Sequence, residues 1–456
     1  MIDESEIISI VEKQRVFFNK GKTKDISFRV KQLKKLKSVI EKNKEEIIES
    51  LSIDMRRHPF ESKISETEMI KSEINFAIKN INSWTKPKKV KTSITTFPSY
   101  GEIFPEPFGL SLIISPWNYP FQLCFVPLVG SISAGNCSLI KPSEISPNTS
   151  KLIAKIVNES FDPDFVCAIQ GNVSVAKKIL CQKFDYIFFT GGTLVAKHIM
   201  VAAAENLTPI TLELGGKSPC IVDKDIKIDE TAKRIVWGKF FNAGQVCIAP
   251  DYLLVQKEIK EELIEKIKYY IHDFYGKDPK KSSSFARIIN ERHFDRICKF
   301  FSEGKIIEGG SFDKKDLYIA PTLIDDVSLN FKVMKEEIFG PVLPILEYKD
   351  QKEAILIVNK FPKPLSLYFF SSNKSKQNEI LKNTSSGGVC INDTILHFGE
   401  RNLPFGGVGD SGIGKYHGKA TFDLFSNKKS VLKRSFSFDI TSLLRFPPHS
   451  KKKFKK

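Results

Sequence analysis

The sequence lacks the cysteine spacings that disulfide frameworks, zinc sites and redox motifs use. Its eight cysteines are scattered through 456 residues without a Cys-x-x-Cys pair. In a chain of this size, such scattering is typical of reduced thiols in a cytoplasmic compartment and gives no sign of a metal site. The N-terminus also lacks the cationic stretch and apolar run of a secretory signal. We therefore expect a cytoplasmic protein without a structural metal.

The sequence also lacks an uninterrupted apolar stretch of the kind that crosses a bilayer. Residues 107–140 contain no charged side chain, and the stretch is longer than the ~20 residues that a membrane helix needs. Proline, glycine and amide residues interrupt it repeatedly, and neither end carries an excess of lysine or arginine. The sequence therefore predicts that this segment lies in a buried core.

Charge of both signs is plentiful, but no compact arginine-rich block is present. Lysine and arginine number 70 against 53 acidic residues, a surplus of 17 (70 minus 53). Because the basic residues are interleaved with other types, we interpret most of them as a solvated surface and expect no nucleic acid partner. A basic binding protein remains the alternative. The basic tail, residues 441–456, ends in Lys451–Lys456 and allows a weak peripheral membrane contact of about 1 kcal/mol per charge.

The order of helical and extended patterns indicates an α/β protein. Apolar residues recur at helical spacing from residue 5 to residue 84, a region that offers no catalytic group. Strands and helices then alternate. Strands are predicted at residues 110–114, 138–140, 166–169 and 186–189. Such alternation predicts a doubly wound parallel sheet of the Rossmann type.

A second α/β region is predicted to begin at Thr211–Leu214. Its expected elements are strands at 252–255 and 342–346 and a long helix at 257–274. Two further segments, 86–96 and 425–434, have the pattern of exposed extended strands. The first of these offers a pairing edge to another subunit.

Two glycine-flanked segments place one carboxylate and one thiol in irregular turns. Glu213 lies in Leu212–Pro219, and Cys247 lies 34 residues later (247 minus 213) in Gly244–Pro250. Most buried cysteines are inert and most glutamates are solvated, so neither residue is informative alone. Glycine lets the backbone approach a ligand, and a nearby carboxylate can take a proton from a thiol or from water. The pair therefore predicts covalent catalysis through Cys247.

Three other glycine-containing turns carry weaker signals. Thr190–Thr193 follows a strand and opens a helix, where an anion is favoured, although an ordinary turn fits equally well. Gly409–Lys415 matches a phosphate-binding loop except that Tyr416 replaces the required serine or threonine. The run 409–412 suggests a serine hydrolase elbow, but Ile413 breaks that motif. We interpret the last two as one structural loop.

Several separate motifs together resemble one enzyme family over nearly the whole chain. They are Pro116–Pro120, Lys141–Glu144, Phe189–Thr193, Leu212–Pro219, Gly244–Pro250, Glu336–Pro341 and Pro404–Gly407. In this order they are similar to the aldehyde dehydrogenase superfamily. The segments Arg287–Phe294, Asn392–Asp393 and Lys415–Gly418 resemble its class 3 and fatty aldehyde dehydrogenase branch.

The resemblance implies an aldehyde dehydrogenase-like α/β fold with a Rossmann-type cofactor domain, an α/β catalytic domain and a small β oligomerisation arm. The expected NAD(P)-binding domain comprises residues 1–85 and 98–210, and the expected catalytic domain comprises residues 211–420. The bridging arm is expected at 86–97 and 421–440, followed by the tail. A homodimer is implied.

The resemblance also implies NAD(P)+-dependent oxidation of an aldehyde to the carboxylic acid. Cys247 forms the thiohemiacetal and thioester, Glu213 is the general base, and the Asn118 amide with the Cys247 N–H forms the oxyanion hole. Medium- or long-chain aliphatic or aromatic aldehydes are the implied substrates. An acylating reductase that passes the thioester to coenzyme A is the rival within the fold, although such relatives usually lack an equivalent of Glu213.

The same resemblance assigns the cofactor-binding residues, and NAD is the expected cofactor. It places Lys141 and Glu144 at the adenosine ribose. Around the pyrophosphate and nicotinamide it places Thr190, Gly191, Gly192, Glu337 and Phe339. Glu144 disfavours a 2′-phosphate by repulsion, whereas Lys141 leaves NADP open. Leu194 and Ala196 depart from the smaller residues of relatives, which predicts a more crowded pyrophosphate turn.

Overall fold

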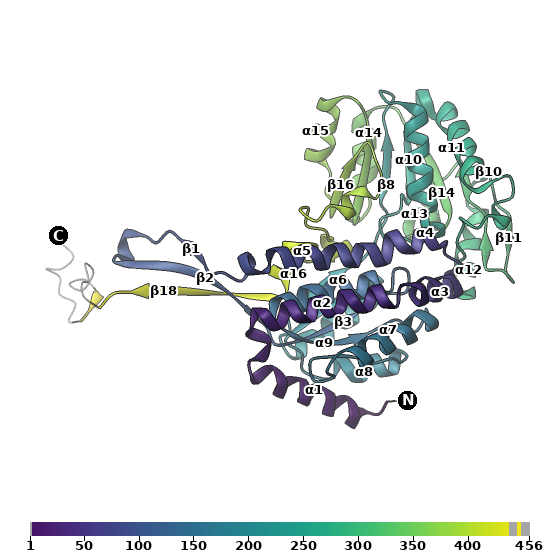
Figure 1. Ribbon diagram of the computed structural model, residues 1–456. Coiled ribbons are helices and arrows are strands. Elements are labelled where there is room, and N and C mark those ends of the chain that lie inside the picture. Colours follow the sequence, from purple (N-terminus) through teal and green to yellow (C-terminus); the bar gives the residue numbers. More distant parts are fainter. Residues whose placement is uncertain (1, 437–444, 448–456) are drawn as a thin grey trace, which may run out of the picture.

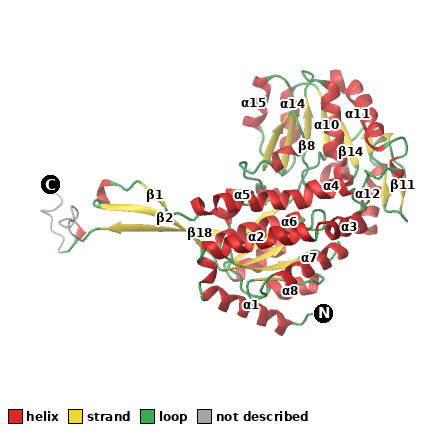
Figure 2. Cartoon of the chain, in the orientation of Figure 1, coloured by secondary structure: helices red, strands yellow, loops and turns green. Residues whose placement is uncertain are grey.

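Two open α/β sheets, one above the other in Figure 1, make up most of the protein, and a small antiparallel sheet projects from them as an arm. The architecture is that of a computed structural model, which describes residues 2–436 and 445–447. Helices flank both large sheets, as Figure 2 shows by colour. The predicted α/β class, with two sheet regions and a β arm, is confirmed.

The lower sheet in Figure 1 has the strand order β17-β7-β6-β3-β4-β5 and is parallel except for β17, which is antiparallel to β7. Its strands are β3 (Leu110–Ile114), β4 (Cys137–Lys141), β5 (Val166–Ala168), β6 (Tyr186–Thr190), β7 (Ile210–Glu213) and β17 (Gly412–Ile413). Parallel strands are joined by helices, which cover both faces of such a sheet. The predicted strands near 110, 138, 166 and 186 are all confirmed.

Helices from the N-terminal region and from the crossovers pack on this sheet. They are α1 (Glu4–Asn19), α2 (Ile26–Lys42), α3 (Lys44–Met55), α4 (Pro59–Ser62), α5 (Glu68–Trp84), α6 (Gln122–Ala134), α7 (Pro147–Ser160), α8 (Val173–Leu180), α9 (Thr193–Glu205) and α16 (Lys419–Leu424). Every residue of α6 is buried, because α2, α5 and α16 cover the side turned away from β3 and β4. The uncharged segment 107–140 therefore forms core, as predicted. Within the described ranges, no helix combines the length and apolarity needed to cross a membrane.

The upper sheet has the order β10-β13-β14-β9-β8-β15-β16, with only β10 antiparallel to its neighbour. Its strands are β8 (Pro219–Val222), β9 (Tyr252–Gln256), β10 (Lys305–Glu308), β13 (Thr322–Asp325), β14 (Val342–Tyr348), β15 (Ser366–Phe370) and β16 (Gly388–Ile391). A short hairpin, β11 (Phe312–Asp313) with β12 (Tyr318–Ile319), lies beside it. The helices of this region are α10 (Ile228–Phe240), α11 (Lys260–Tyr275), α12 (Glu291–Cys298), α13 (Lys332–Lys335), α14 (Gln351–Asn359) and α15 (Lys374–Asn383).

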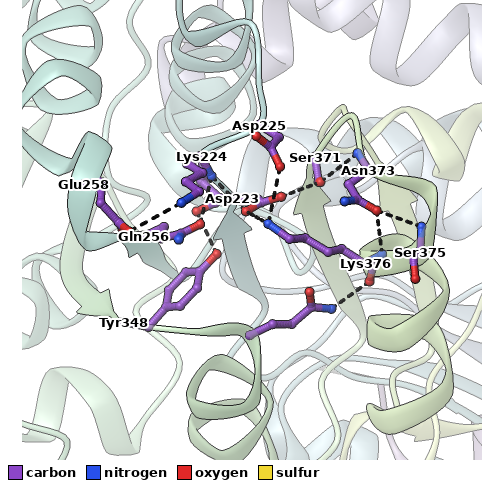
Figure 3. A network of polar contacts seen from close by, with 12 residues as sticks. Asp223, Lys224, Asp225, Gln256, Glu258, Tyr348, Ser371, Asn373, Ser375 and Lys376 are labelled. Atoms are coloured by element: carbon purple, nitrogen blue, oxygen red, sulfur yellow. Dashed lines mark hydrogen bonds and ion pairs between the residues drawn. The ribbon is translucent and has the colours of Figure 1, made fainter.

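Polar contacts tie the carboxyl ends of the upper strands together (Figure 3). Asp223, directly after β8, accepts a hydrogen bond from the Ser371 hydroxyl at 2.6 Å and pairs with Lys376 of α15 at 2.6 Å. On the other side of β8, the Lys224 backbone N–H donates to Gln256 at the end of β9. These contacts fix the edge of the sheet that follows β8, β9 and β15.

The boundary between the two sheet regions differs from the expected one. Residues 211–214 were predicted to begin the second region, but β7 pairs in parallel with β6, from Ile187 opposite Ile210 to Thr190 opposite Glu213. The lower sheet therefore extends to Glu213, and β17 returns to it from far along the chain. Which strands pair across a sheet depends on tertiary packing, and the local sequence pattern does not determine it. The division of the chain into domains remains our proposal.

The arm consists of β1 (Lys88–Val90), β2 (Ser99–Pro107) and β18 (Ser426–Arg434). β18 pairs with β2 over its whole length, from Ser426 opposite Pro107 to Arg434 opposite Ser99. The expected arm strand at 425–434 is confirmed, whereas β2 falls inside the range 98–210 that was expected for the cofactor domain. Apart from 445–447, the expected tail at 441–456 lies outside the described residues.

Candidate active site

A cavity of about 220 Å³, with Cys247 on its wall, lies among segments that contribute to both large sheets. Apolar and aromatic side chains form nearly all of its surface. Its lining residues are Ile64, Ser65, Met69, Tyr119, Gln122, Leu123, Trp237, Phe241, Val246, Cys247, Ile248, Ile395, Leu396, Phe398 and Gly399. An apolar cavity with one reactive group is the usual form of a small-molecule site.

The backbone before Cys247 is held in an uncommon conformation. Asn242, Ala243 and Gly244, directly after α10, all have positive φ, at 49°, 51° and 73°. For residues other than glycine this conformation costs roughly 1–2 kcal/mol each. A Cβ at Gly244 would lie 2.2 Å from the Gly340 carbonyl oxygen, so only glycine fits there. Tight backbone of this kind is common at functional sites.

The Gln245 side chain fastens the nucleophile loop, residues 241–247, to the upper region. Its amide nitrogen donates to the Asn242 carbonyl at 3.1 Å and to the Arg287 carbonyl at 2.9 Å. Its amide oxygen accepts from the Ile289 N–H at 3.0 Å. A buried amide with all these partners has one orientation, so it fixes the backbone on which Cys247 stands.

Glu213 ends β7 and is buried, with 1% of its surface exposed. Among the described residues, neither carboxylate oxygen has a hydrogen-bond partner. Burial raises the pKa of this carboxyl to about 7, although the neighbouring Cys247 and Thr190 side chains lower it in part. A buried carboxyl that titrates near neutral pH is suited to act as a general base.

Cys247 is enclosed by protein but keeps accessible surface in the cavity. Burial raises the pKa of its thiol well above the usual range, and the nearby Glu213 and Glu337 carboxylates raise it further. The resting group is therefore a neutral thiol at physiological pH. Because the thiolate is the nucleophile, the site needs a base for each turnover.

Asn118 comes from the turn between β3 and α6 and reaches the nucleophile loop. It is buried, and its side-chain amide donates to the Gln245 carbonyl at 3.1 Å. The structure thus brings the three predicted catalytic residues together from three separate segments. An amide donor next to a nucleophilic cysteine is the arrangement that stabilises a developing oxyanion.

Five predicted cofactor residues lie at or just after the carboxyl ends of β4 and β6, namely Lys141, Glu144, Thr190, Gly191 and Gly192. Lys141 ends β4 and forms an ion pair with Glu144, whose side chain is 37% exposed. Thr190 ends β6, and its buried hydroxyl has no partner among the described residues. Gly192 precedes α9, and a Cβ added there would meet no atom within 4 Å. Open space at a helix N-terminus fits a pyrophosphate.

The predicted crowding at this turn is absent. The Leu194 side chain is 77% exposed and leaves the space beside Gly192 empty, whereas Ala196 is packed inside. The side chain of Leu194 is therefore no obstacle to a ligand at Gly191 and Gly192.

Glu337 and Phe339 lie between α13 and β14. The Glu337 carboxylate packs against Gly215, where a Cβ would lie 2.2 Å from one oxygen. Burial, and secondarily Asp251, raises its pKa to about 8. The Phe339 ring meets the Trp117 ring edge-on at 5.3 Å between centroids. Glu337 also lies close enough to the Cys247 thiol to raise its pKa.

Sequence reasoning missed side chains that the N-terminal helices bring to this site. Arg57, Glu61 and Glu66 lie in the region where no catalytic group was expected, yet they reach the turns that carry Asn118 and Cys247. Tyr119 and Trp237 line the cavity. A fully buried arginine has no local signature in a sequence rich in surface lysine and arginine.

Comparison with known proteins identifies relatives along the whole chain. The model of the aldehyde dehydrogenase family matches residues 1–431. The mouse protein named "Aldehyde dehydrogenase, dimeric NADP-preferring" is 44% identical over 97% of this chain and 98% of its own. The 4,4'-diaponeurosporen-aldehyde dehydrogenase of Staphylococcus aureus is 44% identical over 97% and 96%. Several similar proteins carry the name family 3.

Solved structures agree in fold. A substrate-bound Staphylococcus aureus aldehyde dehydrogenase superposes with a TM-score of 0.95 at 43% identity, covering 98% of each chain. An indole-3-acetaldehyde dehydrogenase in complex with NAD+ superposes with a TM-score of 0.86 at 27% identity, covering 95% of this chain and 90% of its own.

Proposed function

Because the chain belongs to the aldehyde dehydrogenase family, we propose that Cys247, Glu213 and Asn118 carry out its NAD(P)+-dependent oxidation of an aldehyde to the carboxylic acid. The observation that carries this assignment is the Cys247 thiol on an apolar cavity wall, beside a buried carboxylate without a hydrogen-bond partner among the described residues. That carboxylate has a pKa of about 7, which leaves it ready to accept a proton.

Catalysis begins when Glu213 takes the thiol proton and the sulfur attacks the aldehyde carbon. The carbonyl oxygen becomes an oxyanion, which accepts hydrogen bonds from the Asn118 amide and the Cys247 N–H. Preorganised donors of this kind contribute about 10²- to 10³-fold each. The buried position of Asn118 removes competing water from the bonds that form.

NAD(P)+, when bound, accepts the hydride that leaves the substrate carbon. The protein holds the reacting carbon as a thiohemiacetal on the Cys247 sulfur. As the oxyanion collapses, this thiohemiacetal becomes a thioester. Glu213 then passes its proton on and accepts another from a water, whose oxygen attacks the thioester. The carboxylic acid leaves and the thiol is restored. In this mechanism Glu213 directs the thioester to hydrolysis, whereas an acylating reductase transfers the acyl group to coenzyme A. Analysis of the products with and without coenzyme A distinguishes these two reactions.

For the cofactor, we propose that the seven predicted residues hold a dinucleotide, supported by the open space at Gly192 and the unpartnered buried hydroxyl of Thr190 among the described residues. Lys141 and Glu144 would hold the adenosine ribose, Thr190, Gly191 and Gly192 the pyrophosphate, and Glu337 and Phe339 the nicotinamide end. The family uses NAD or NADP, and we propose a preference for NAD in this chain. The Glu144 carboxylate supports it, because it repels a 2′-phosphate.

Replacing Glu144 with glutamine is expected to shift this preference toward NADP. Loss of the negative charge leaves Lys141 to attract the 2′-phosphate, so the ratio of kcat/KM for NADP over NAD rises roughly tenfold, equal to about 1.4 kcal/mol. Steady-state kinetics with both cofactors measures the ratio. Glu159→Gln, an exposed residue of α7, is the matched control and leaves the ratio unchanged. A falling ratio in Glu144→Gln would contradict the assignment.

The cavity supports medium- or long-chain aliphatic or aromatic aldehydes as substrates. With an apolar wall, each buried methylene contributes about 0.8 kcal/mol, roughly fourfold in kcat/KM. We expect kcat/KM to climb along a series of straight-chain aldehydes and level off when the 220 Å³ are filled. Met69→Gln, which makes the wall polar at similar volume, flattens that climb. A flat wild-type series rules out this substrate class.

Exposed apolar side chains of the arm support a homodimer. Val90, Ile94, Phe97, Tyr100, Phe104 and Leu432 are all at least 40% exposed. Apolar side chains exposed on a projecting sheet often mark an interface. The mouse relative is named dimeric.

Charges placed on the arm are expected to separate the subunits. We predict that Ile94→Glu with Leu432→Glu weakens dimerisation at least roughly 100-fold, because two interface side chains whose loss costs about 1.4 kcal/mol each give that factor. Sedimentation equilibrium across a dilution series measures the association. Leu356→Glu, on α14 outside the arm and with an exposure between those of Ile94 and Leu432, is the control and keeps the wild-type mass. A monomeric wild-type protein would exclude the dimer.

Two further proposals concern the cellular setting. All eight cysteines, each within the described ranges, are unpaired, which supports a reducing compartment such as the cytoplasm. A weak membrane contact through the basic tail rests on its charges alone. Cell fractionation tests the first, and co-sedimentation with anionic vesicles at low and high salt tests the second.

A further inference from the structure

Arg57 is the largest of the fully buried side chains among the described residues. It contacts both the turn that carries Asn118 and the nucleophile loop before Cys247. It stands between α3 and α4, with no exposed side-chain surface. Its guanidinium pairs with Glu66 at 2.9 Å, and Glu61 lies 3.8 Å away. Arg57, Glu61 and Glu66 together form what we call the Arg57 cluster.

The guanidinium binds two segments at the same time, the nucleophile loop and the turn between β3 and α6 at residues 115–121, which carries Asn118 and which we call the oxyanion turn. One terminal nitrogen of Arg57 donates to the carbonyl oxygen of Asn118, and Nε donates to Asn242 Oδ1 at 3.2 Å. Its plane also lies over the Tyr119 ring, 4.6 Å from the centroid. A planar guanidinium donates in several fixed directions at once, which is why it can set the relative placement of two loops.

The partners of Arg57 extend this connection on both sides. Glu66 accepts the Gln122 N–H at 2.6 Å, at the beginning of α6, and so holds the far end of the oxyanion turn. Asn242 donates to the Gln245 carbonyl at 3.3 Å, the same oxygen that accepts from the Asn118 side chain. The Asn118 amide and the backbone before Cys247 are therefore joined through one buried arginine.

Stability alone does not explain this cluster. A buried ion pair is expensive to desolvate, and replacing one by apolar residues is often neutral or stabilising. The arginine also binds the side chain of Asn242, whose left-handed backbone conformation costs free energy on folding. Burial raises the pKa of both Glu61 and Glu66 to about 7, against the lowering effect of Arg57. Without Arg57, these carboxyls would take up protons rather than remain as unpaired charges.

We propose that Arg57 is a positioning residue that fixes the Asn118 amide relative to the Cys247 backbone and thereby sets the geometry of the oxyanion hole. It is not among the residues that line the cavity, and its polar contacts within the described residues include none of the predicted cofactor residues, so its effect passes through Asn118 and the nucleophile loop. The inference rests on the proposed roles of Asn118 and Cys247.

The test is a double-mutant cycle between Arg57 and Asn118. In the wild-type background, Arg57→Met is expected to slow the pre-steady-state formation of NADH roughly 10- to 100-fold, because the oxyanion donors are misplaced rather than removed, and outright removal of one costs about 10²- to 10³-fold. In an Asn118→Ala background, the same change has a clearly smaller effect, because only the part that passes through the nucleophile loop remains. Arg57→Lys keeps the buried positive charge but not the planar set of guanidinium donors. Its rate of NADH formation is therefore expected to lie between those of the wild type and Arg57→Met. The affinity for NADH stays constant throughout.

Arg29→Met is the matched control. Arg29 is also buried, and it donates to the Thr23, Ser133 and Lys24 carbonyls away from the catalytic turns. Its replacement lowers the Tm but leaves the rate of NADH formation within about twofold at temperatures well below the Tm. Equal slowing by Arg57→Met in both Asn118 backgrounds, or an unaltered rate in Arg57→Lys and Arg57→Met, overturns the proposal. If Arg57→Met does not fold, Arg57→Lys alone completes the cycle.

A second readout needs no turnover. Alkylation of Cys247 by iodoacetamide, followed by mass spectrometry, is expected to change at least about threefold in Arg57→Met, with the exposed Cys181 as internal reference. The same alkylation is unchanged in Arg29→Met. A wild-type protein that oxidises no aldehyde would refute the proposed function, whereas unchanged alkylation in Arg57→Met refutes the positioning role.

Discussion

Cys247→Ser is expected to lower aldehyde oxidation at least about 10⁴-fold, the largest loss that any single change in this chain should cause. Glu213 has a pKa of about 7 and can accept a thiol proton, but a serine hydroxyl is far too weak an acid to give one up to it. The cavity and the cofactor residues stay in place. Steady-state NADH formation at saturating aldehyde measures the loss, and fluorescence titration with NADH shows that cofactor binding is retained.

The matched control for this change is Cys298→Ser. Cys298 is also partly buried, but it ends α12 and lies outside the cavity lining. Its replacement leaves turnover within about twofold of wild type, as expected of a substitution away from the site. Turnover of Cys247→Ser within tenfold of wild type would show that another group attacks the aldehyde.

The parts of the fold that the sequence predicted are those with strong local patterns. The apolar runs of β3, β4 and β6 and the uncharged stretch around α6 announce buried elements, because no charge interrupts them. Partner choice between strands is not local. β7 joins β6 rather than β8, and β2 leaves the cofactor region to pair with β18, more than 300 residues later along the chain. Those pairings depend on tertiary packing.

The candidate site divides in the same way. Glycine neighbours marked Glu213 and Cys247 from the residues themselves, and the turn at residues 190–193 gave a weaker local signal for an anion. Asn118, Lys141, Glu144, Glu337 and Phe339 came only from family resemblance. Arg57 carried neither signal. Its contacts with Asn118 and Asn242 span 61 and 185 residues, and its sequence neighbourhood is that of an ordinary amphipathic helix end. Its burial became evident only when the lower helices were packed.

Glu213→Gln is expected to abolish multiple turnover, with kcat falling roughly 10²- to 10⁴-fold. In the wild-type enzyme, kcat rises about tenfold per pH unit below pH 7 and levels off above it, because Glu213 must be ionised and its pKa is about 7. In the glutamine variant, kcat does not rise with pH in this range. Stopped-flow and steady-state NADH traces from pH 5.5 to 8.5 measure both effects. If kcat of Glu213→Gln still rose with pH below pH 7, the rise would belong to the ionisation of another group.

The same substitution should make the protein more stable at alkaline pH. The pKa of Glu213 is about 7 in the folded state and 4.5 in the unfolded state. Between these values the folded protein binds a proton that the unfolded chain has lost, so the free energy of unfolding decreases as pH rises from 4.5 to 7. Above pH 7 the full penalty of the ionised, buried carboxylate applies, roughly 3 kcal/mol as an upper bound. Glu213→Gln removes it.

Urea unfolding at two pH values separates this effect from general changes in packing. At pH 8 we expect Glu213→Gln to raise the free energy of unfolding by roughly 1–3 kcal/mol, and at pH 4.5 by close to zero, since the wild-type carboxyl is then protonated in the folded state. Glu159→Gln, on the surface of α7, shows no difference at either pH. A gain of equal size at both pH values would mean that burial of charge is not its cause. A gain confined to pH 8 would show that the protein is less stable because it keeps an ionised, buried carboxylate beside Cys247.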